Sequence, residues 1–311
     1  MKDKVVSIVG PTAVGKSKLG IEVAKRFNGE VISGDSMQIY RDMNIGTAKV
    51  TEKEMEGIVH HMIDIKDPEQ SFSVAEFQNR VQSLIKDIAS RGKCPVLVGG
   101  TGLYIEATLH NFNFSTQEKD ARVQERLENQ LKECGKEQMY QRLVGIDPIQ
   151  AEKIHPNNER RVLRALEVYE TTGKTMSEYQ EQQQAASPFH PVVIGLEMER
   201  ELLYERINDR VDQMMEEGLL EEVRMLYDRG LEKHQSMSAI GYKEFIPYFK
   251  GECTLERAIE LLKRNSRRYA KRQYTYFKNK LSVTWYEIHP NGYKDKFEKI
   301  LNDLAGMLKK S

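Results

Sequence analysis

Eight residues near the N-terminus have the types and spacing that bind phosphate groups. They match the pattern G-x-x-x-x-G-K-[ST] at every fixed position and run Gly10-Pro11-Thr12-Ala13-Val14-Gly15-Lys16-Ser17. In such a loop, backbone N–H groups surround the phosphate oxygens and the following helix adds the positive end of its dipole. Lys16 supplies a formal charge, and Ser17 supplies a hydroxyl ligand for Mg²⁺. The loop therefore predicts a phosphate site with Mg²⁺ as its ion.

This pattern alone leaves several classes of enzyme open. A nucleotide hydrolase should place an aspartate directly after a second apolar strand. Here Val96-Leu97-Val98 runs instead into Gly99-Gly100-Thr101. A small-molecule or nucleotide kinase remains possible, with a helical segment as the lid over the phosphates. Whether a nucleotide can occupy the loop also stays open.

The loop needs a strand before it and a helix after it, and the sequence offers both. Lys4–Val9 is a β-branched run typical of a buried parallel strand, and apolar residues at four-residue spacing follow the loop. Further strands are predicted at 31–33, 95–98, 192–196 and 283–286, and further helices from Ser73, at 199–217 and at 254–280. Strands alternating with amphipathic helices predict an α/β fold, a P-loop NTPase-like parallel sheet flanked by helices. Ligands then belong at the carboxyl ends of the strands, where loops 10–17, 34–40 and 99–104 lie.

Residues 115–190 have a different character from the rest of the chain. They are polar, rich in Glu, Gln and Arg, and contain no convincing strand. We predict an all-helical insertion over 115–190 in a core formed by residues 1–114 and 191–311.

Composition excludes some classes of protein and leaves others open. The 311 residues carry no net charge, so the bulk charge does not indicate nucleic acid. Three widely spaced cysteines argue against both a disulfide framework and a cysteine-based zinc site. Without a signal peptide or an apolar run near the ~20 residues of a membrane span, we expect a cytoplasmic protein. No exposed apolar repeat is evident, which favours a monomer.

Local clustering of charge does indicate RNA. Seven basic residues and no acidic ones lie between positions 264 and 280, and four aromatic residues interleave with them. Basic side chains bind phosphates and aromatic rings stack on unpaired bases, although a solvated helix face is the alternative. The residues are Arg264, Arg267, Arg268, Lys271, Arg272, Lys278 and Lys280, with Tyr269, Tyr274, Tyr276 and Phe277.

Further motifs narrow the choice. In order along the chain they are the phosphate loop, Ile32-Ser33-Gly34-Asp35-Ser36-Met37-Gln38-Ile39-Tyr40, Ile45-Gly46-Thr47-Ala48-Lys49, His60-His61-Met62-Ile63-Asp64, Val98-Gly99-Gly100-Thr101-Gly102-Leu103-Tyr104, His155-Pro156-Asn157-Asn158, Ala239-Ile240-Gly241-Tyr242-Lys243 and Lys271-Arg272-Gln273. Together they closely resemble the tRNA dimethylallyltransferases, also called tRNA isopentenyltransferases, over nearly the whole chain. Eukaryotic members carry a C-terminal zinc finger whose Cys/His spacing is absent here, so the chain resembles the bacterial type.

The resemblance implies transfer of a dimethylallyl group from its diphosphate to N6 of the adenine just 3′ of a tRNA anticodon. The phosphate loop would then hold a leaving group. Asp35 is the implied general base, with turn capping or Mg²⁺ binding as its alternatives, and Arg210 is the implied diphosphate-binding arginine. Thr12 and Thr101 are implied to bind the diphosphate or the target nucleotide, with simple turn roles as the alternative. The role of Arg206 stays open.

The implied tRNA-binding residues fall into five groups along the chain. Gln38 suits the paired donor and acceptor of an adenine, and helix 159–163 is placed against the anticodon loop. The full set is Asp35, Ser36, Met37, Gln38, Thr101, Glu159, Arg160, Arg161, Val162, Leu163, Gly241, Tyr242, Lys243, Lys271, Arg272 and Gln273. A metal site at His60 and His61 is not predicted, because adjacent side chains point oppositely on a strand. An RNA-binding P-loop module without prenyl transfer is the alternative outside enzymes.

Overall fold

The computed structural model describes residues 2–112, 114, 121–181 and 187–310. It divides the chain into two units, Met1–Leu109 with Ser187–Ser311 and His110–Ala186. The second unit falls on the helical segment predicted at 115–190. Residues 115–120 and 182–186, near the predicted ends of that segment, lie outside the described residues. No described helix is both long and apolar enough to cross a membrane.

The first unit is built on a parallel sheet, which confirms the predicted fold class. Its six strands have the order β3-β2-β4-β1-β5-β6. The strands are β1 Lys4–Val9, β2 Gly29–Ser33, β3 His60–His61, β4 Cys94–Val98, β5 His190–Glu197 and β6 Thr284–Glu287. Because β1 lies between β4 and β5, the loop that follows β1 leaves the middle of the sheet, where neighbouring loops can surround a ligand.

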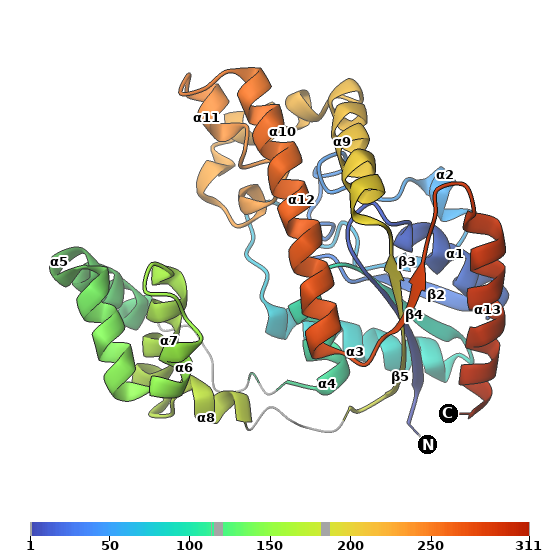
Figure 1. Ribbon diagram of the computed structural model, residues 1–311, viewed down its shortest axis with the longest axis horizontal. Coiled ribbons are helices and arrows are strands. Elements are labelled where there is room, and N and C mark those ends of the chain that lie inside the picture. Colours follow the sequence, from blue (N-terminus) through green and yellow to red (C-terminus); the bar gives the residue numbers. More distant parts are fainter. Residues whose placement is uncertain (1, 113, 115–120, 182–186, 311) are drawn as a thin grey trace. The chain divides into compact units, whose positions relative to one another are not determined.

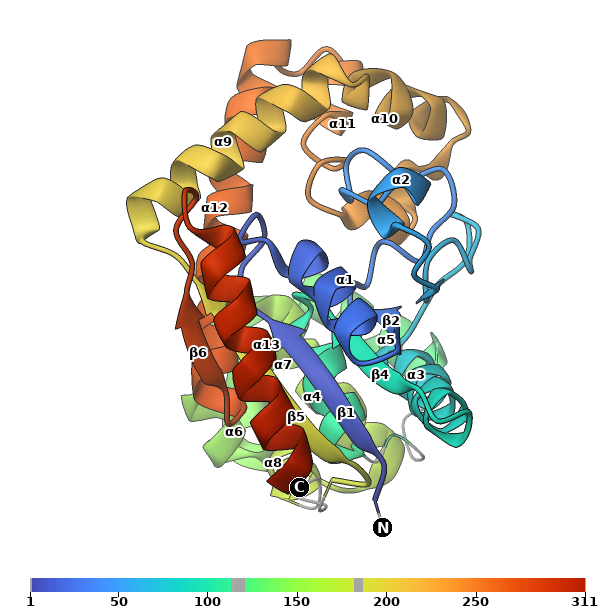
Figure 2. The same ribbon diagram turned by 90° about the vertical axis from the view of Figure 1, so that its right-hand side faces the viewer.

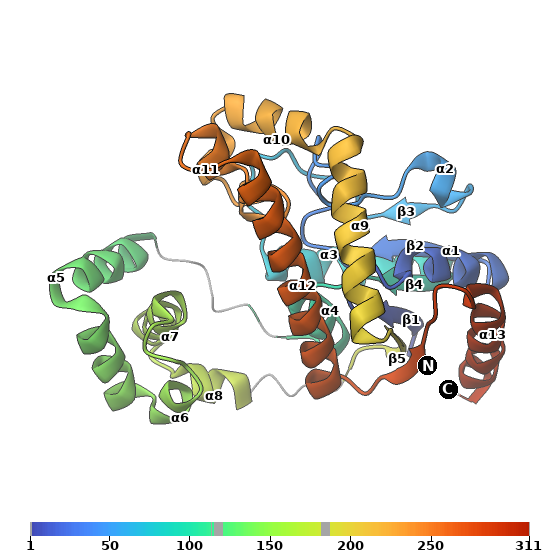
Figure 3. The ribbon, with the colours of Figure 1, turned by 45° about the horizontal axis from the view of Figure 1, so that its top comes forward.

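Side-chain alternation along β1 divides the core into two layers. Val5 and Val9 pack on one face of the sheet, and Val6 and Ile8 pack on the other. On the face of Val6 lie α1 Lys16–Arg26 and α13 Tyr293–Lys310. On the face of Val5 lie α3 Val74–Ser90, α4 Gly102–His110 and α12 Leu255–Lys280. Figures 2 and 3 show these two helical layers.

The structure contains several helices that the sequence does not predict. Helix α13 packs Phe297, Ile300 and Leu304 against the sheet, at the spacing of one helical face. Beyond the carboxyl ends of the strands stand the further helices α2 Glu52–Met55, α9 Arg200–Glu216, α10 Leu219–Asp228 and α11 Ile246–Phe249, with 3₁₀ turns at Leu231–Lys233 and Ser236–Ser238. Only α9 of these helices is predicted from the pattern of apolar residues. Helices α2 and α11 have only four residues each. The apolar face of α10 is recognised only from the side chains that it buries in the structure.

The second unit has its own core of apolar side chains. Its helices are α5 Ala121–Ile146, α6 Pro148–Glu152, α7 Glu159–Thr172 and α8 Met176–Glu181, coloured green in Figure 1. Leu127, Leu143 and Leu166 are buried between them. The buried Asp147 accepts the N–H of Gln150 and both the N–H and the hydroxyl of Ser177. This carboxylate therefore fixes α6 against α8.

Candidate active site

The phosphate loop joins β1 to α1, as its sequence context predicts. Gly10 has φ 141°, and a Cβ atom there would lie 2.4 Å from the carbonyl oxygen of Leu196 on β5. Only glycine allows both this backbone conformation and this approach. The ammonium of Lys16 donates to the carbonyl of Pro11 at 2.7 Å, while Ser17 is exposed in the first turn of α1. The loop thus presents backbone N–H groups, one ammonium and one accessible hydroxyl.

Two arginines on α9 face the same loop but differ in their contacts. The Nε atom of Arg206 donates to the carbonyl of Ala13 at 3.1 Å, and its guanidinium lies 5.7 Å from the ring centroid of Tyr293. Arg210 forms no hydrogen bond or ion pair with its side chain among the residues described here. Both line the same cavity. The guanidinium of Arg210 is therefore available to an anionic ligand, whereas Arg206 is partly engaged by the loop itself.

Asp35 follows β2 at the carboxyl edge of the sheet. One carboxylate oxygen accepts the N–H of Met37 at 2.8 Å, which closes a local turn. Burial raises the pKa of Asp35, although the Met37 N–H and the positive charge of Lys16 act in the opposite direction. Burial and the nearby Arg210 lower the pKa of Lys16 to about 7. These perturbed groups meet in one place, as acid and base groups of an active site do.

Two cavities of the first unit meet at Asp35. The larger, of about 1310 Å³, reaches along the phosphate loop and contains Lys16, Ser17 and Arg206 in its wall. The smaller, of about 310 Å³, is lined by apolar side chains and by the polar edge of α12. The residues that line both are Thr12, Ala13, Asp35, Thr47, Ala48, Arg210, Met214 and Tyr269. A molecule in each cavity would therefore bring its reacting atoms together beside Asp35.

The loops after β1, β2 and β4 are tied together by one side-chain amide and one hydroxyl. The amide of Gln273 on α12 accepts the N–H of Thr12 at 2.8 Å and donates to the carbonyl of Gly100 at 3.1 Å. The hydroxyl of Thr101 accepts the N–H of Ser36 at 3.2 Å. Tyr269 lies near Thr101 and Gln273, and burial raises its pKa to about 12, so its hydroxyl stays protonated. These contacts make the edge of the site rigid before any ligand enters.

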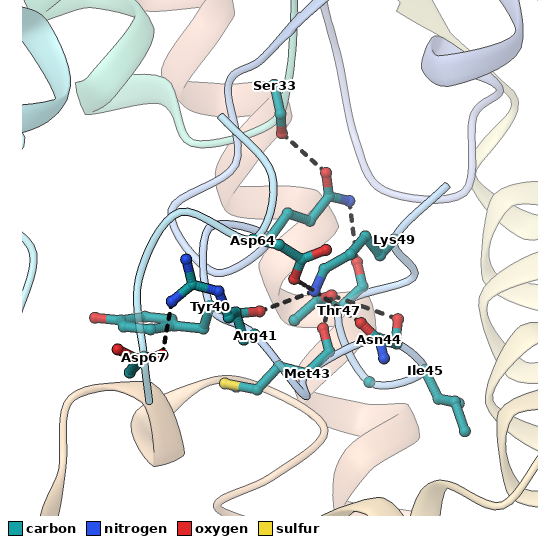
Figure 4. Close-up of polar contacts among 12 residues, drawn as sticks. Ser33, Tyr40, Arg41, Met43, Asn44, Ile45, Thr47, Lys49, Asp64 and Asp67 are labelled. Carbon is teal, nitrogen blue, oxygen red and sulfur yellow. Dashed lines mark hydrogen bonds and ion pairs between the residues drawn. The ribbon is translucent and has the colours of Figure 1, made fainter. Parts of the chain in front are cut away.

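The segment after Asp35 is held by Gln38 and Lys49 (Figure 4). The Gln38 amide accepts from the hydroxyl of Ser33 at 2.9 Å and donates to the carbonyls of Thr47 and Ala48. The ammonium of Lys49 contacts Asp64 at 2.6 Å, and it also contacts Tyr40 and Asn44. Both ends of the Gln38 amide are thus engaged within the chain, so its predicted pairing with an adenine must share or replace these bonds.

Three of the predicted tRNA-binding residues have side chains with almost no exposed surface. Tyr242 has no exposed surface and Gln273 is 4% exposed, and both hydrogen-bond inside the first unit. Val162 is 1% exposed and packs in the core of the second unit. These side chains contact mainly their neighbours within each unit, and their roles in tRNA binding stay predictions. Gly241 is also buried.

The interleaved aromatic residues of α12 also serve the interior more than the surface. Phe277 is fully buried, and the hydroxyl of Tyr276 bonds the carboxylate of Glu106. Tyr274 packs edge-on against Trp285, with ring centroids 5.2 Å apart. Of these four aromatic residues of α12, only Tyr269 lines the two cavities. Of the four rings, that of Tyr269 is therefore the one placed to meet a ligand in the cavities.

The remaining predicted RNA contacts lie at the surface of their own units. Lys243, Lys271 and Arg272 are exposed in the first unit, and Lys243 and Arg272 line the smaller cavity. In the second unit, Glu159, Arg160 and Arg161 are exposed in the first turn of α7, with Leu163 partly buried. His60 and His61 have different partners, the carbonyl of Ile58 and the carboxylate of Glu30.

Some residues of the site have no signal in the linear pattern. Tyr293 opens α13, lines the larger cavity and packs its ring against Gly15. Met214 and Asp209 enter the cavity walls from α9. Thr47 and Ala48 belong to the motif at 45–49, but the motif alone indicates no role for them.

Comparison with known proteins finds similarity to a single enzyme family. A family model described as IPP transferase matches residues 38–280. The "tRNA dimethylallyltransferase" of Oceanobacillus iheyensis is 61% identical over 308 residues, covering 99% of this chain and 98% of that protein. The solved "tRNA isopentenylpyrophosphate transferase" of Bacillus halodurans is 52% identical, with a TM-score of 0.75 and coverage of 99% and 98%. A eukaryotic "dimethylallyltransferase acting on tRNA" is 37% identical, with a TM-score of 0.77 and coverage of 91% and 74%.

Proposed function

Because this chain belongs to the IPP transferase family, we propose that it transfers a dimethylallyl group from dimethylallyl diphosphate to tRNA. The acceptor is N6 of the adenine 3′-adjacent to the anticodon, and the products are N6-dimethylallyladenosine and diphosphate. One observation carries the proposal, namely the position of Asp35 where the phosphate-loop cavity meets the smaller cavity.

The chemistry divides between the two cavities. The diphosphate lies on the phosphate loop, and the target adenine enters the smaller cavity, leaving its stack at a cost of a few kcal/mol. An exocyclic adenine amine is a weak nucleophile because its lone pair is delocalised into the ring. As N6 bonds to the allylic carbon, Asp35 takes the N6 proton and the carbon–oxygen bond breaks, leaving its electron pair on the diphosphate. Lys16, Arg210 and the loop N–H groups stabilise that charge.

Mg²⁺ is proposed as the cofactor. The exposed hydroxyl of Ser17 beside Lys16 is a hard oxygen donor, which suits Mg²⁺ together with the oxygens of a bound diphosphate. Among the described residues there is no group of three or more His, Cys, Asp or Glu side chains that could hold a metal. The substrate would therefore supply most of the ligands. When bound, the ion would add positive charge where the leaving group develops negative charge.

Removal of the Ser17 hydroxyl tests this assignment. Ser17→Ala is expected to reduce the gain in dimethylallyl diphosphate affinity on adding Mg²⁺ by about tenfold, equal to ~1.4 kcal/mol. Isothermal titration calorimetry with Mg²⁺ or with EDTA measures the gain without turnover. Ser17→Thr keeps the hydroxyl and should behave like the wild type. An equal Mg²⁺ effect in Ser17→Ala would remove Ser17 from the metal site.

Binding of the diphosphate should depend on pH through Lys16. Its pKa in the free protein is lowered to about 7 by burial and by Arg210, and a bound diphosphate favours the charged ammonium. Below pH 7 the ammonium is already charged. As pH rises above 7, binding must take up one proton, so Kd should rise by up to about 16-fold between pH 7 and 8.5. The contribution is thus present at low pH and lost as pH rises.

Calorimetry in buffers of different ionisation enthalpy measures this proton uptake. Lys16→Arg is the control, because a guanidinium stays charged throughout this range. Its residual pH dependence reports the titration of the substrate alone. A wild-type Kd that follows the Lys16→Arg curve between pH 6.5 and 8.5 would contradict the prediction.

The proposal also covers the tRNA-binding residues, the oligomeric state and the cellular location. Lys243, Lys271 and Arg272 in the first unit, and Glu159, Arg160 and Arg161 in the second, are exposed residues that we assign to tRNA binding. We infer a monomer from the sequence, in which no exposed apolar repeat is evident. We infer a cytoplasmic location from the tRNA substrate.

One experiment separates this function from its alternatives. The protein is incubated with dimethylallyl diphosphate, Mg²⁺ and an anticodon stem-loop with adenine after the anticodon, and the RNA is weighed by mass spectrometry. The expected result is a gain of one C5 unit. RNA binding without a gain in mass would favour a binding module, and ATP consumption without a gain would favour a kinase.

A further inference from the structure

Glu222 is half-buried in a hydrogen-bond network, and its side chain lines neither cavity. It lies on α10, and its carboxylate accepts the backbone N–H groups of three successive residues, Asn44, Ile45 and Gly46, at 2.8, 2.9 and 3.0 Å. The hydroxyl of Tyr242 donates to the same carboxylate at 2.6 Å. Successive N–H groups that converge in this way form an anion-binding nest, and hydrogen bonds to a charged acceptor are strong. The nest at residues 44–46 is thus filled by the protein's own carboxylate.

Tyr242 contacts both the Glu222 carboxylate and the loop at Gly46. Its ring packs so close to Gly46 that a Cβ atom at position 46 would lie 2.5 Å from the ring. Tyr242 has no exposed surface, and burial and Glu222 raise the pKa of its phenol well above the usual range. Its hydroxyl therefore remains a donor to Glu222 at any working pH. Glycine at 46, tyrosine at 242 and glutamate at 222 are consequently one structural unit.

The anchored loop carries the groups that fix the site. The next two carbonyls, of Thr47 and Ala48, accept from the amide of Gln38 at 3.2 and 3.3 Å. The other end of that amide accepts from Ser33, whose hydroxyl in turn accepts the N–H of Asp35 at 3.4 Å. Thr47 and Ala48 also line both cavities. A continuous set of hydrogen bonds therefore runs from Glu222 through the loop and Gln38 to the backbone of Asp35.

Regular secondary structure does not hold this loop in place. Residues 41–50 form turns and lie in no strand or helix. Lys49 holds the far end by its contacts with Tyr40, Asn44 and Asp64. Glu222 holds the near end, and its own side chain lines neither cavity. Its effect on the reaction must therefore pass through the position of the loop.

We propose that Glu222 is a positioning residue for prenyl transfer, which fixes the wall of the acceptor cavity relative to Asp35. The inference rests on the proposed function. Displacement of a reacting group by about 1 Å can cost about 10²-fold in rate. The affinity for dimethylallyl diphosphate should change little, because it arises from the phosphate loop, Lys16 and Arg210.

Glu222→Gln tests the proposal with little change in size. The new NH₂ group would face N–H or O–H donors, so at least one hydrogen bond of the nest is lost. We expect the single-turnover rate of C5 transfer to the stem-loop to fall about 10²-fold. The Kd for dimethylallyl diphosphate and the fraction of binding-competent sites, both from calorimetry, should stay within threefold of wild type. Amides 44–49 should exchange faster with deuterium.

Two variants keep the test decisive. Glu221→Gln changes the exposed neighbour on the same helix and should match the wild type. Tyr242→Phe removes one donor to Glu222 and should give a smaller rate loss that is not additive with Glu222→Gln. If Glu222→Gln fails to fold, Tyr242→Phe carries the test alone.

A wild-type rate per binding-competent site in Glu222→Gln, or in Tyr242→Phe where that variant alone folds, would overturn the positioning role. Loss of diphosphate affinity in parallel with the rate would also overturn it, because it would indicate general disorder of the site. Failure of the wild type to transfer a C5 unit would reject the proposed function instead.

Discussion

Asp35→Asn is expected to lower the rate of prenyl transfer by about 10²–10⁴-fold, the usual contribution of a positioned general base. The amide oxygen of asparagine can still accept the N–H of Met37, which Asp35 now accepts at 2.8 Å. The turn after β2 should therefore persist. Dimethylallyl diphosphate and the stem-loop should bind with nearly unchanged Kd, so single-turnover kinetics at saturating substrates would isolate the chemical step.

The pH profile gives a second measurement of the same role. Asp35 must be ionised to accept the N6 proton, so kcat/KM should fall as pH drops through its pKa. Burial raises that pKa, which places the acid limb above the usual range for aspartate. The limb should be absent from the residual activity of Asp35→Asn.

A matched control lies on the same loop. Asp42→Asn makes the same chemical change in an exposed residue that lines neither cavity and pairs with Arg229. Exposed pairs contribute little to stability, so this variant should transfer at nearly the wild-type rate. Unchanged turnover in Asp35→Asn would remove Asp35 from the role of base.

Local motifs predict the phosphate loop well because the relevant contacts lie within a few residues of each other. A strand, eight loop residues and a helix form one continuous segment, and the residue types alone specify its backbone. The carboxyl edge of a parallel sheet then brings Asp35 and Thr101 to the same place. The chemistry at that edge follows from residue types and chain order.

Helical periodicity explains why three adjacent residues of α12 differ in burial. The predicted RNA contacts Lys271, Arg272 and Gln273 are adjacent in the sequence, yet residues on a helix turn by about 100° from one to the next. Gln273 therefore shares the buried face with Phe277, while Lys271 and Arg272 remain exposed. Adjacency in a motif indicates a common purpose, but it does not place the side chains on one face.

Long-range hydrogen bonds to the backbone leave no pattern at all. Glu222 binds N–H groups about 178 residues away, and every residue except proline has such a group. The residue types at positions 44 and 45 therefore give no indication of the hydrogen bonds to Glu222. Of the three residues that Glu222 binds, only Gly46 has a type that the contact requires, because the ring of Tyr242 excludes any side chain there.

Arg210→Gln should produce the second large loss, about 10²–10³-fold in kcat, the scale of removing one preorganised group that stabilises developing charge. Arg210 lines both cavities, and burial lowers its pKa because its charge is poorly solvated. Among the described residues its guanidinium forms no direct ion pair, although Glu54 and Asp35 act on its charge from a distance. A leaving diphosphate is the group that this charge would stabilise as the carbon–oxygen bond breaks.

Two other arginines of α9 calibrate the result. Arg206→Gln should cost about tenfold, because the wild-type side chain already donates to the Ala13 carbonyl and packs over Tyr293. Arg200→Gln changes an exposed residue outside both cavities and should have no effect on kcat. Equal losses in Arg206→Gln and Arg210→Gln would mean that general positive potential, and not one directed guanidinium, stabilises the leaving group. A loss in Arg210→Gln that appears only in the Kd for dimethylallyl diphosphate would show that its charge acts equally on the bound substrate and the transition state.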